Sequence, residues 1–197
     1  MKKGEKRKQD LLDIAYRMFL TKGYENTSID GIIEEAGIAK GTFYYYFKTK
    51  EQMLEEVIGQ MLDRQEENAK AILGSGMPIP QKIVGIVASF RPEQTEEAIN
   101  EALHRPENSF MHEKTLRSIV ERAVPLLADV AEEGIKAGIF SCNNVTERVK
   151  LILLISNSLF NDDGFTERDV EVFIDTVEKI LGAGEGTMGF ITELIKR

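Results

Sequence analysis

The sequence predicts an all-α fold of about nine helices. Apolar residues recur at helical spacing in one segment after another, and glycine or proline stands near the ends of these segments. No segment shows the alternation that is typical of a β-strand. The chain has 197 residues, of which 42% are hydrophobic, which is enough for a packed core. This length fits one fair-sized domain, or a small domain joined to a larger one.

The N-terminal third contains four expected helices. They cover residues 5–21, 28–36, 39–46 and 49–73. Thr27 or Ser28 is a good N-cap for the second helix, because a hydroxyl can accept a hydrogen bond from a free backbone amide. Gly23 and Gly37 follow the first and second helices, at positions where glycine commonly ends a helix. The second and third helices are therefore short and separated by a tight turn.

The remaining two thirds contain further amphipathic segments. Helices are expected over residues 78–88, 92–103, 109–137, 145–160, 166–181 and 190–196. Pro125 lies inside one of them and should kink or end it locally, because proline lacks the amide proton that a helix interior needs. Residues 182–189 contain four glycines and are expected to be irregular.

Charge divides the chain into a basic head and an acidic remainder. Residues 1–50 hold ten Lys or Arg against seven Asp or Glu, whereas the rest hold fifteen against twenty-six. Such an asymmetry suggests different partners for the two parts.

Cys142 is the only cysteine, so no intrachain disulfide is expected and a reducing compartment is favoured. The longest apolar run, residues 151–155, is far shorter than a membrane span, so a cytoplasmic protein without a membrane partner is expected.

Residues 28–46 have the spacing of a helix-turn-helix, in which the second helix enters the major groove of DNA. Phe43 and Phe47 lie four residues apart and can join a core, which leaves Lys40, Tyr44 and Tyr45 on other faces of this helix. A tyrosine hydroxyl can donate to a phosphate oxygen, and lysine supplies salt-dependent affinity for the backbone. Double-stranded DNA is therefore the expected partner.

The stretch TSIDGIIEEAGIAKGTFYYYFKTKEQML, residues 27–54, resembles the signature of the TetR family of transcriptional regulators. The resemblance implies an N-terminal three-helix DNA-binding domain over residues 1–62. It also implies a larger C-terminal helical domain, residues 63–197, for ligand binding and dimerisation. Tyr46 departs from the family pattern, where histidine is frequent, and so does Gly31, where alanine is commoner. A changed base preference is expected from the first departure.

Carried over by position, the resemblance implies a set of DNA contacts. The residues are Thr27, Lys40, Gly41, Thr42, Tyr44, Tyr45, Tyr46 and Lys50. Thr27 would bind phosphate at the start of the second helix, and Lys50 would hold a phosphate at the start of the fourth. The others would lie at the start and along the exposed sides of the recognition helix.

The resemblance also implies a homodimer and a small-molecule effector. The dimer would form through helices near residues 145–161 and 166–182, packed as a four-helix bundle. The first of these is apolar nearly all round at its centre, which independently requires cover on two sides; burial in the monomer core is the alternative. Four residues are candidates for an effector pocket: Phe90, His104, Phe110 and Met111. Neither the effector nor the operator sequence can be named.

The favoured interpretation is a dimeric repressor that a small molecule releases from a pseudo-palindromic operator. An activator is the alternative within the same class. No motif for a cofactor, a metal ion or a catalytic nucleophile is present, so none of these is expected. A small helical enzyme is one alternative function, and a helical protein-interaction module without DNA binding is another. The second alternative would lack phosphate ligands, yet Thr27, Lys40, Thr42 and Lys50 are all present.

Overall fold

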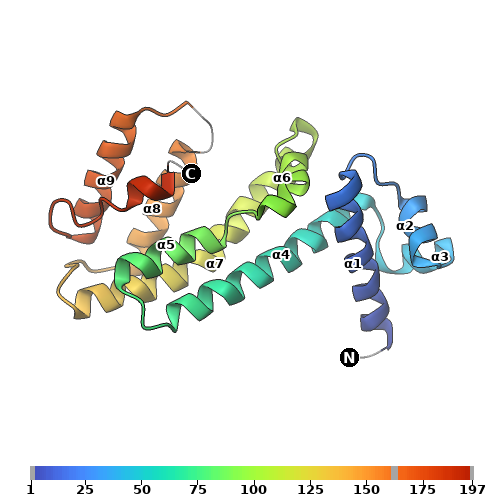
Figure 1. The fold of residues 1–197 in the computed structure, drawn as a ribbon, viewed down its shortest axis with the longest axis horizontal. Helices are drawn as coiled ribbons and strands as arrows, with labels where there is room; N and C mark the ends of the chain where they lie inside the picture. The colour runs from blue at the N-terminus through green and yellow to red at the C-terminus, as the bar shows by residue number, and fades with distance from the viewer. Residues whose placement is uncertain (1–2, 161–163, 196–197) are drawn as a thin grey trace. The chain divides into compact units, whose positions relative to one another are not determined.

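The computed structural model describes residues 3–160 and 164–195, and within these ranges the predicted all-α fold is confirmed (Figure 1). Ten α-helices and two short 3-10 helices are present in the described residues, and each of the ten expected segments contains one of the α-helices. In the same part of the chain, no helix combines the length and the apolar character that crossing a membrane requires. Residue 196, the end of the last predicted helix, lies outside the described residues, as does residue 161.

The helices form two compact units that do not follow the chain in simple order. The first unit contains the residues up to Asp63 together with Pro92–Leu116. The second contains Arg64–Arg91 and the chain from Arg117 onward. Two helices, α4 (Lys50–Leu73) and α7 (Ser109–Lys136), contribute residues to both units. The functional boundary expected at residues 62–63 remains a prediction.

The first unit is built on α1 (Lys3–Lys22), α2 (Ile29–Ala36) and α3 (Lys40–Tyr46). Phe19 of α1, Ile32 of α2, and Phe43 and Phe47 in and after α3 are fully buried, as are three residues of α4: Met53, Leu54 and Val57. Ile32 is the buried isoleucine of α2, because its neighbours at positions 29 and 33 lie at the edges of the apolar face and are half-buried. The buried aromatic residues hold the three short helices in one core.

The segment Pro92–Leu116 belongs to this first unit and packs on α1. It contains η1 (Gln94–Glu96), α6 (Glu97–Leu103), η2 (Pro106–Asn108) and the start of α7. Helical structure begins at position 94 and not at Pro92, since Glu93 and Glu96 form a capping box there. The hydroxyl of Tyr16 in α1 donates to the buried carboxylate of Glu96 at 2.9 Å. This segment is therefore attached to α1.

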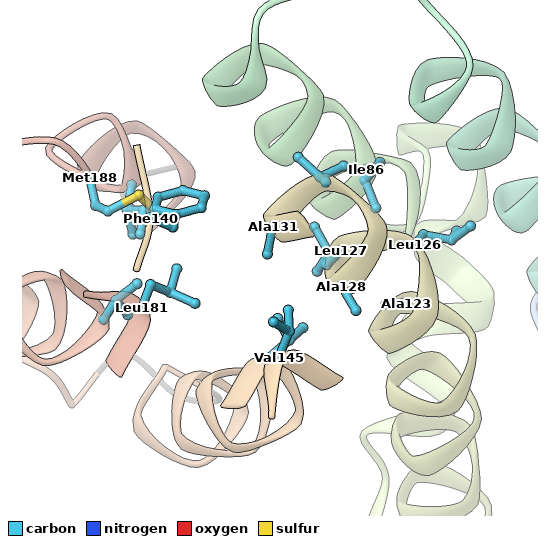
Figure 2. Packing of buried hydrophobic residues seen from close by; sticks show 14 of the residues in the cluster. Ile86, Ala123, Leu126, Leu127, Ala128, Ala131, Phe140, Val145, Leu181 and Met188 are labelled. Atoms are coloured by element: carbon cyan, nitrogen blue, oxygen red, sulfur yellow. The ribbon is translucent and has the colours of Figure 1, made fainter. Parts of the chain in front are cut away.

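The second unit contains the rest of α4 and α7 with α5 (Ile79–Ser89), α8 (Val145–Leu159), α9 (Glu167–Leu181) and α10 (Ile191–Ile195). Figure 2 shows its core, to which α7 contributes Ala123, Leu126, Leu127, Ala128 and Ala131. The buried ammonium of Lys82 on α5 donates to both carboxylate oxygens of Glu133 on α7, at 2.7 and 3.0 Å. Apolar packing and this ion pair thus join α5 to α7.

Pro125 was expected either to kink its helix or to end it. The long helix α7 does not end there. Pro125 removes a backbone amide that would donate to the carbonyl of Glu121. Both residues are exposed, so water can satisfy that carbonyl at little cost. The helix therefore continues past the proline to Lys136.

One glycine joins the end of α9 to the loop that follows α7. Gly182 has a φ of 62°, and a Cβ atom there would lie 2.1 Å from the carbonyl oxygen of Ser141. The amide of Ser141 donates to the carbonyl of Leu181 at 3.0 Å. No residue with a side chain fits this approach without displacing the loop, so the loop after α7 is held against α9.

Candidate nucleic-acid interface

The turn between α2 and α3 has the geometry that a helix-turn-helix requires. Ser28 caps α2, since its hydroxyl accepts a hydrogen bond from the amide of Gly31 at 3.0 Å. Gly37 ends α2 in the left-handed region, with a φ of 59°. Its amide lies within hydrogen-bonding reach of the carbonyls of Ile33 and Glu34. The chain then turns sharply, and α3 begins at Lys40.

The aromatic run of α3 is divided between the core and the surface. Phe43 and Phe47 are fully buried, and their ring centroids lie 5.8 Å apart. Tyr44 is 38% exposed and Tyr45 is 77% exposed, so both phenols reach solvent. Tyr46 is half-buried, and its ring meets that of Tyr45 edge-on at 4.9 Å. The prediction that Tyr44 and Tyr45 project outward over a phenylalanine core is confirmed.

Gly41 is exposed at the start of α3, and nothing in the protein requires a glycine there. A Cβ atom built on Gly41 would meet no heavy atom within 4 Å. Glycine in a helix costs about 1 kcal/mol relative to alanine, so the fold alone does not explain it. The next residue, Thr42, is half-buried at the edge of the same surface.

Lys40 is exposed and forms an ion pair with a residue that sequence reasoning missed. Its ammonium lies 3.0 Å from a carboxylate oxygen of Asp30 on α2. The hydrogen bond and the charge of Asp30 raise the pKa of Lys40. The two residues are ten positions apart on different helices, so no helical spacing could indicate this pair. A phosphate that binds Lys40 must compete with Asp30.

Lys50 at the start of α4 is held against Tyr24. Its ammonium donates to the backbone carbonyl of Tyr24 at 2.9 Å and lies 4.1 Å from the centroid of the tyrosine ring. Burial raises the pKa of the Tyr24 phenol, and the charges of Glu51 and Glu25 raise it further. An ammonium group has three donors, so the bond to this carbonyl leaves donors that can meet a phosphate. The contact orients Lys50 and leaves its predicted role open.

The side chain of Thr27 is not available for the phosphate contact that was predicted for this residue. Thr27 is 1% exposed, and its hydroxyl donates to the carbonyl of Gly23 at 2.8 Å, with the carbonyl of Met18 at 3.3 Å. The threonine thus closes the turn after α1 from the inside. The exposed hydroxyl at the start of α2 is that of its neighbour, Ser28.

The four residues predicted to bind an effector are divided between the two units. Phe90 is buried in the core of the second unit. His104, Phe110 and Met111 belong to the first unit, where Phe110 is 78% exposed. The four residues were chosen because they lie between the middle helices in the sequence. The segment from Pro92 to Leu116, however, belongs to the first unit, whereas the residues before and after it belong to the second. His104 and His112 stack with ring centroids 4.6 Å apart, and the described residues contain no group of three ligands for a metal ion.

A cavity of about 290 Å³ lies instead wholly within the second unit. Its walls come from α5, α7, α8, α9 and the C-terminal segment with α10. Figure 2 shows Leu127 and Ala131 on one side of this region and Phe140, Leu181 and Met188 on the other. The sequence carried no signal for it beyond helical periodicity, because these residues come together only through tertiary packing.

Two family models match the chain over most of its length. "Bacterial regulatory proteins, tetR family" matches residues 11–57, which include the helix-turn-helix. "Tetracyclin repressor-like, C-terminal domain" matches residues 91–177. The chain belongs to the TetR family. The resemblance noted in residues 27–54 is thereby confirmed, and so is the predicted class, a DNA-binding transcriptional regulator.

Known TetR-family proteins resemble the chain to different extents. The transcriptional repressor KstR2 of Mycolicibacterium smegmatis is 38% identical over 85 residues, which are 43% of this chain and 42% of that protein. The fatty acid metabolism regulator protein of Bacillus subtilis is 25% identical over 142 residues, 70% of this chain and 73% of that protein. A transcriptional regulator from Cytophaga hutchinsonii has a similar fold, with a TM-score of 0.63 and 20% identity over 94% of this chain and 96% of that chain.

Proposed function

We propose that this TetR-family chain is a dimeric cytoplasmic repressor that binds a pseudo-palindromic operator through α3. A small molecule in the cavity of the second unit releases it. One observation supports α3 as the DNA-binding surface: Tyr44 and Tyr45 are exposed, whereas Phe43 and Phe47 of the same aromatic run are buried. Two adjacent exposed phenols can contact a partner, and a helix that bears them can enter the major groove.

The proposed DNA surface contains seven of the eight predicted contacts. Lys40, Gly41 and Thr42 present the start of α3, where free backbone amides favour a phosphate. The phenols of Tyr44 and Tyr45 can donate to phosphate or pack on sugar and base edges. Tyr46 supports the ring of Tyr45, and the ammonium of Lys50 stands at the start of α4. The hydroxyl of Ser28 takes the place that was assigned to Thr27.

The proposed dimer forms through α8 and α9. Leu151, Leu154 and Ile155 are 54%, 45% and 40% exposed, and their spacing places them on one stripe of α8. Val172 on α9 is 57% exposed. The opposite stripe of α8 lines the cavity through Ile152 and its neighbours, so α8 is apolar on two faces. A second copy of α8 and α9 would cover the outer stripe, which favours a dimer over burial in one monomer.

Release requires a connection from the cavity to the DNA-binding head. Arg91 lines the cavity, and the next residue, Pro92, begins the segment that belongs to the first unit. In that unit Tyr16 is bonded to Glu96, and Lys114 pairs with Glu55. A ligand that shifts the end of α5 would therefore move a segment fastened to α1 and α4. One relative is named for fatty acid metabolism, and the apolar cavity suits an apolar metabolite.

The proposal is tested by selecting operator fragments from random DNA and measuring their affinity by fluorescence anisotropy. A specific dissociation constant in the range of about 10⁻⁸ to 10⁻¹¹ M is expected, at least about a thousandfold below that for random DNA. The selected site should be pseudo-palindromic, because a dimer with two-fold symmetry presents two equal recognition helices. Equal affinity for selected and random fragments would overturn the proposal.

A further inference from the structure

We infer that the cavity of the second unit selects an uncharged, largely apolar molecule with one hydrogen-bonding oxygen, such as a medium-chain alcohol, ketone or ester. This inference rests on the proposed effector role and adds the chemical class of the effector. The cavity volume of about 290 Å³ lies at the lower end of the range of small-molecule pockets, roughly 300–1,000 Å³. At ~30 Å³ per water-sized atom, it accommodates on the order of ten non-hydrogen atoms.

The walls of the cavity favour an aliphatic body. Phe160 and Phe173 meet edge-on with ring centroids 5.2 Å apart and form an apolar corner between α8 and α9. Met188 of the C-terminal segment is buried and also lines the cavity, and methionine adapts its shape readily. Leu127 and Leu153 line other walls from α7 and α8. Contact with these side chains would stabilise a bound hydrocarbon chain by removing it from water.

The charges around the cavity disfavour an ionised ligand. Among the described residues that line it, none is acidic, so a buried ammonium ion would have no carboxylate partner. One cation, Arg91, lines the cavity, and its guanidinium donates to the backbone carbonyl of Leu194 on α10. A carboxylate would have to share the donors of this guanidinium with that carbonyl, and it would lose its own hydration on entering an otherwise apolar cavity. A buried ion that lacks a well-placed partner is costly, whereas a neutral oxygen needs one hydrogen bond.

Two neighbouring polar side chains on α8 can supply that hydrogen bond. Ser156 and Asn157 line the cavity and are half-buried. Neither side chain has a hydrogen-bond partner within the part of the chain that the structure describes. Their hydroxyl and amide groups can both donate and accept, which suits a hydroxyl or carbonyl oxygen. They are exceptional in a lining that is otherwise apolar apart from Arg91.

The test compares three probes with one hydrocarbon chain: 1-decanol, decanoate and decylammonium, each below its aggregation limit. Binding to the full-length protein is measured by calorimetry and by the melting temperature. The alcohol is expected to bind, and each ion at least about tenfold more weakly. Asn157→Leu and Ser156→Ala should each weaken alcohol binding by about fivefold, the effect of one lost hydrogen bond. Thr146→Ala, at an exposed position of α8 that does not line the cavity, should bind the alcohol like the wild type.

Filling the cavity gives the second arm of the test. Ala131→Leu places extra volume into the lining and should abolish binding of the alcohol; Leu153→Phe serves if the first variant does not fold. Tighter binding of either ion than of the alcohol, or unchanged alcohol binding in folded Asn157→Leu and cavity-filled variants, would overturn the inference.

Operator anisotropy in the same samples separates this inference from the proposed function. If the alcohol binds in the cavity but the operator stays bound, the proposed release of DNA by the effector is refuted, whereas the inferred chemical class of the ligand is supported. If another compound releases the operator equally from the wild type and from the cavity-filled variant, the inferred ligand class is refuted, whereas release of DNA by a small molecule is supported.

Discussion

Replacing Tyr45 with alanine should separate DNA binding from folding, and replacing its neighbour Phe43 should have the opposite effect. The two aromatic residues lie two positions apart on α3, yet Tyr45 is 77% exposed and Phe43 is fully buried. Tyr45→Ala removes a ring that a partner can contact and that the core does not use. Phe43→Ala removes a ring that packs against Phe47 and against the edge of Tyr44.

The magnitudes follow from these two environments. An exposed substitution changes stability by about 0.5 kcal/mol or less, so the melting temperature of Tyr45→Ala should stay within about 2 °C of the wild type. A lost base or phosphate contact of about 1–3 kcal/mol weakens operator binding roughly 5- to 100-fold. Truncation of a buried phenylalanine costs about 3–5 kcal/mol, which lowers the melting temperature by roughly 6–20 °C.

The assays are fluorescence anisotropy on the selected operator and differential scanning calorimetry on the same preparations. Tyr45→Phe is the matched control, because it removes the hydroxyl and keeps the ring. If the hydroxyl binds phosphate, this variant should lose most of the affinity that the alanine variant loses. The reasoning is refuted if Tyr45→Ala binds the operator like the wild type, or if Phe43→Ala melts at the wild-type temperature.

Three further predictions follow from single contacts. Asp30→Asn should free Lys40 for a phosphate, which steepens the slope of log K against log salt by about 0.9 on random DNA. Leu154→Glu should weaken the dimer on the order of 100-fold in sedimentation, since a two-fold interface carries the buried charge twice. Stability should fall as the pH drops from about 7 to 6, because the unfolded chain protonates His112 near pH ~6.5, whereas burial and a neighbouring imidazole lower its pKa in the folded state. In chemical denaturation, His112→Gln should reduce this loss.

Each of these predictions has a matched control. Glu34→Gln removes an exposed charge of α2 that forms no ion pair within the described residues, and it should leave the salt slope unchanged. Gln81→Glu adds a charge to an exposed position of α5 and should leave the dimer intact. An unchanged slope in Asp30→Asn, a fully dimeric Leu154→Glu, or identical pH profiles with and without His112 would each contradict the corresponding contact.

Much of the fold and of the DNA-binding surface could be predicted from the sequence because it depends on local rules. Helical periodicity and the glycines at positions 23, 37 and 182 located nearly every helix to within a few residues. The four-residue spacing of Phe43 and Phe47 identified the buried face of α3, and Tyr44 and Tyr45 then had to face outward. Such inferences need only the geometry of one helix and its turn.

Tertiary structure alone decided which distant residues meet. The burial of Thr27 depends on carbonyls of α1 and its turn, and the partner of Lys40 lies on another helix. The four residues predicted to bind an effector are divided between the two units because segment 92–116 packs on α1, a long-range contact that periodicity does not encode. The cavity likewise exists because several helices leave space between them, with Ser156 and Asn157 facing it. A local pattern determines which face of a helix is apolar, and packing determines what that face covers.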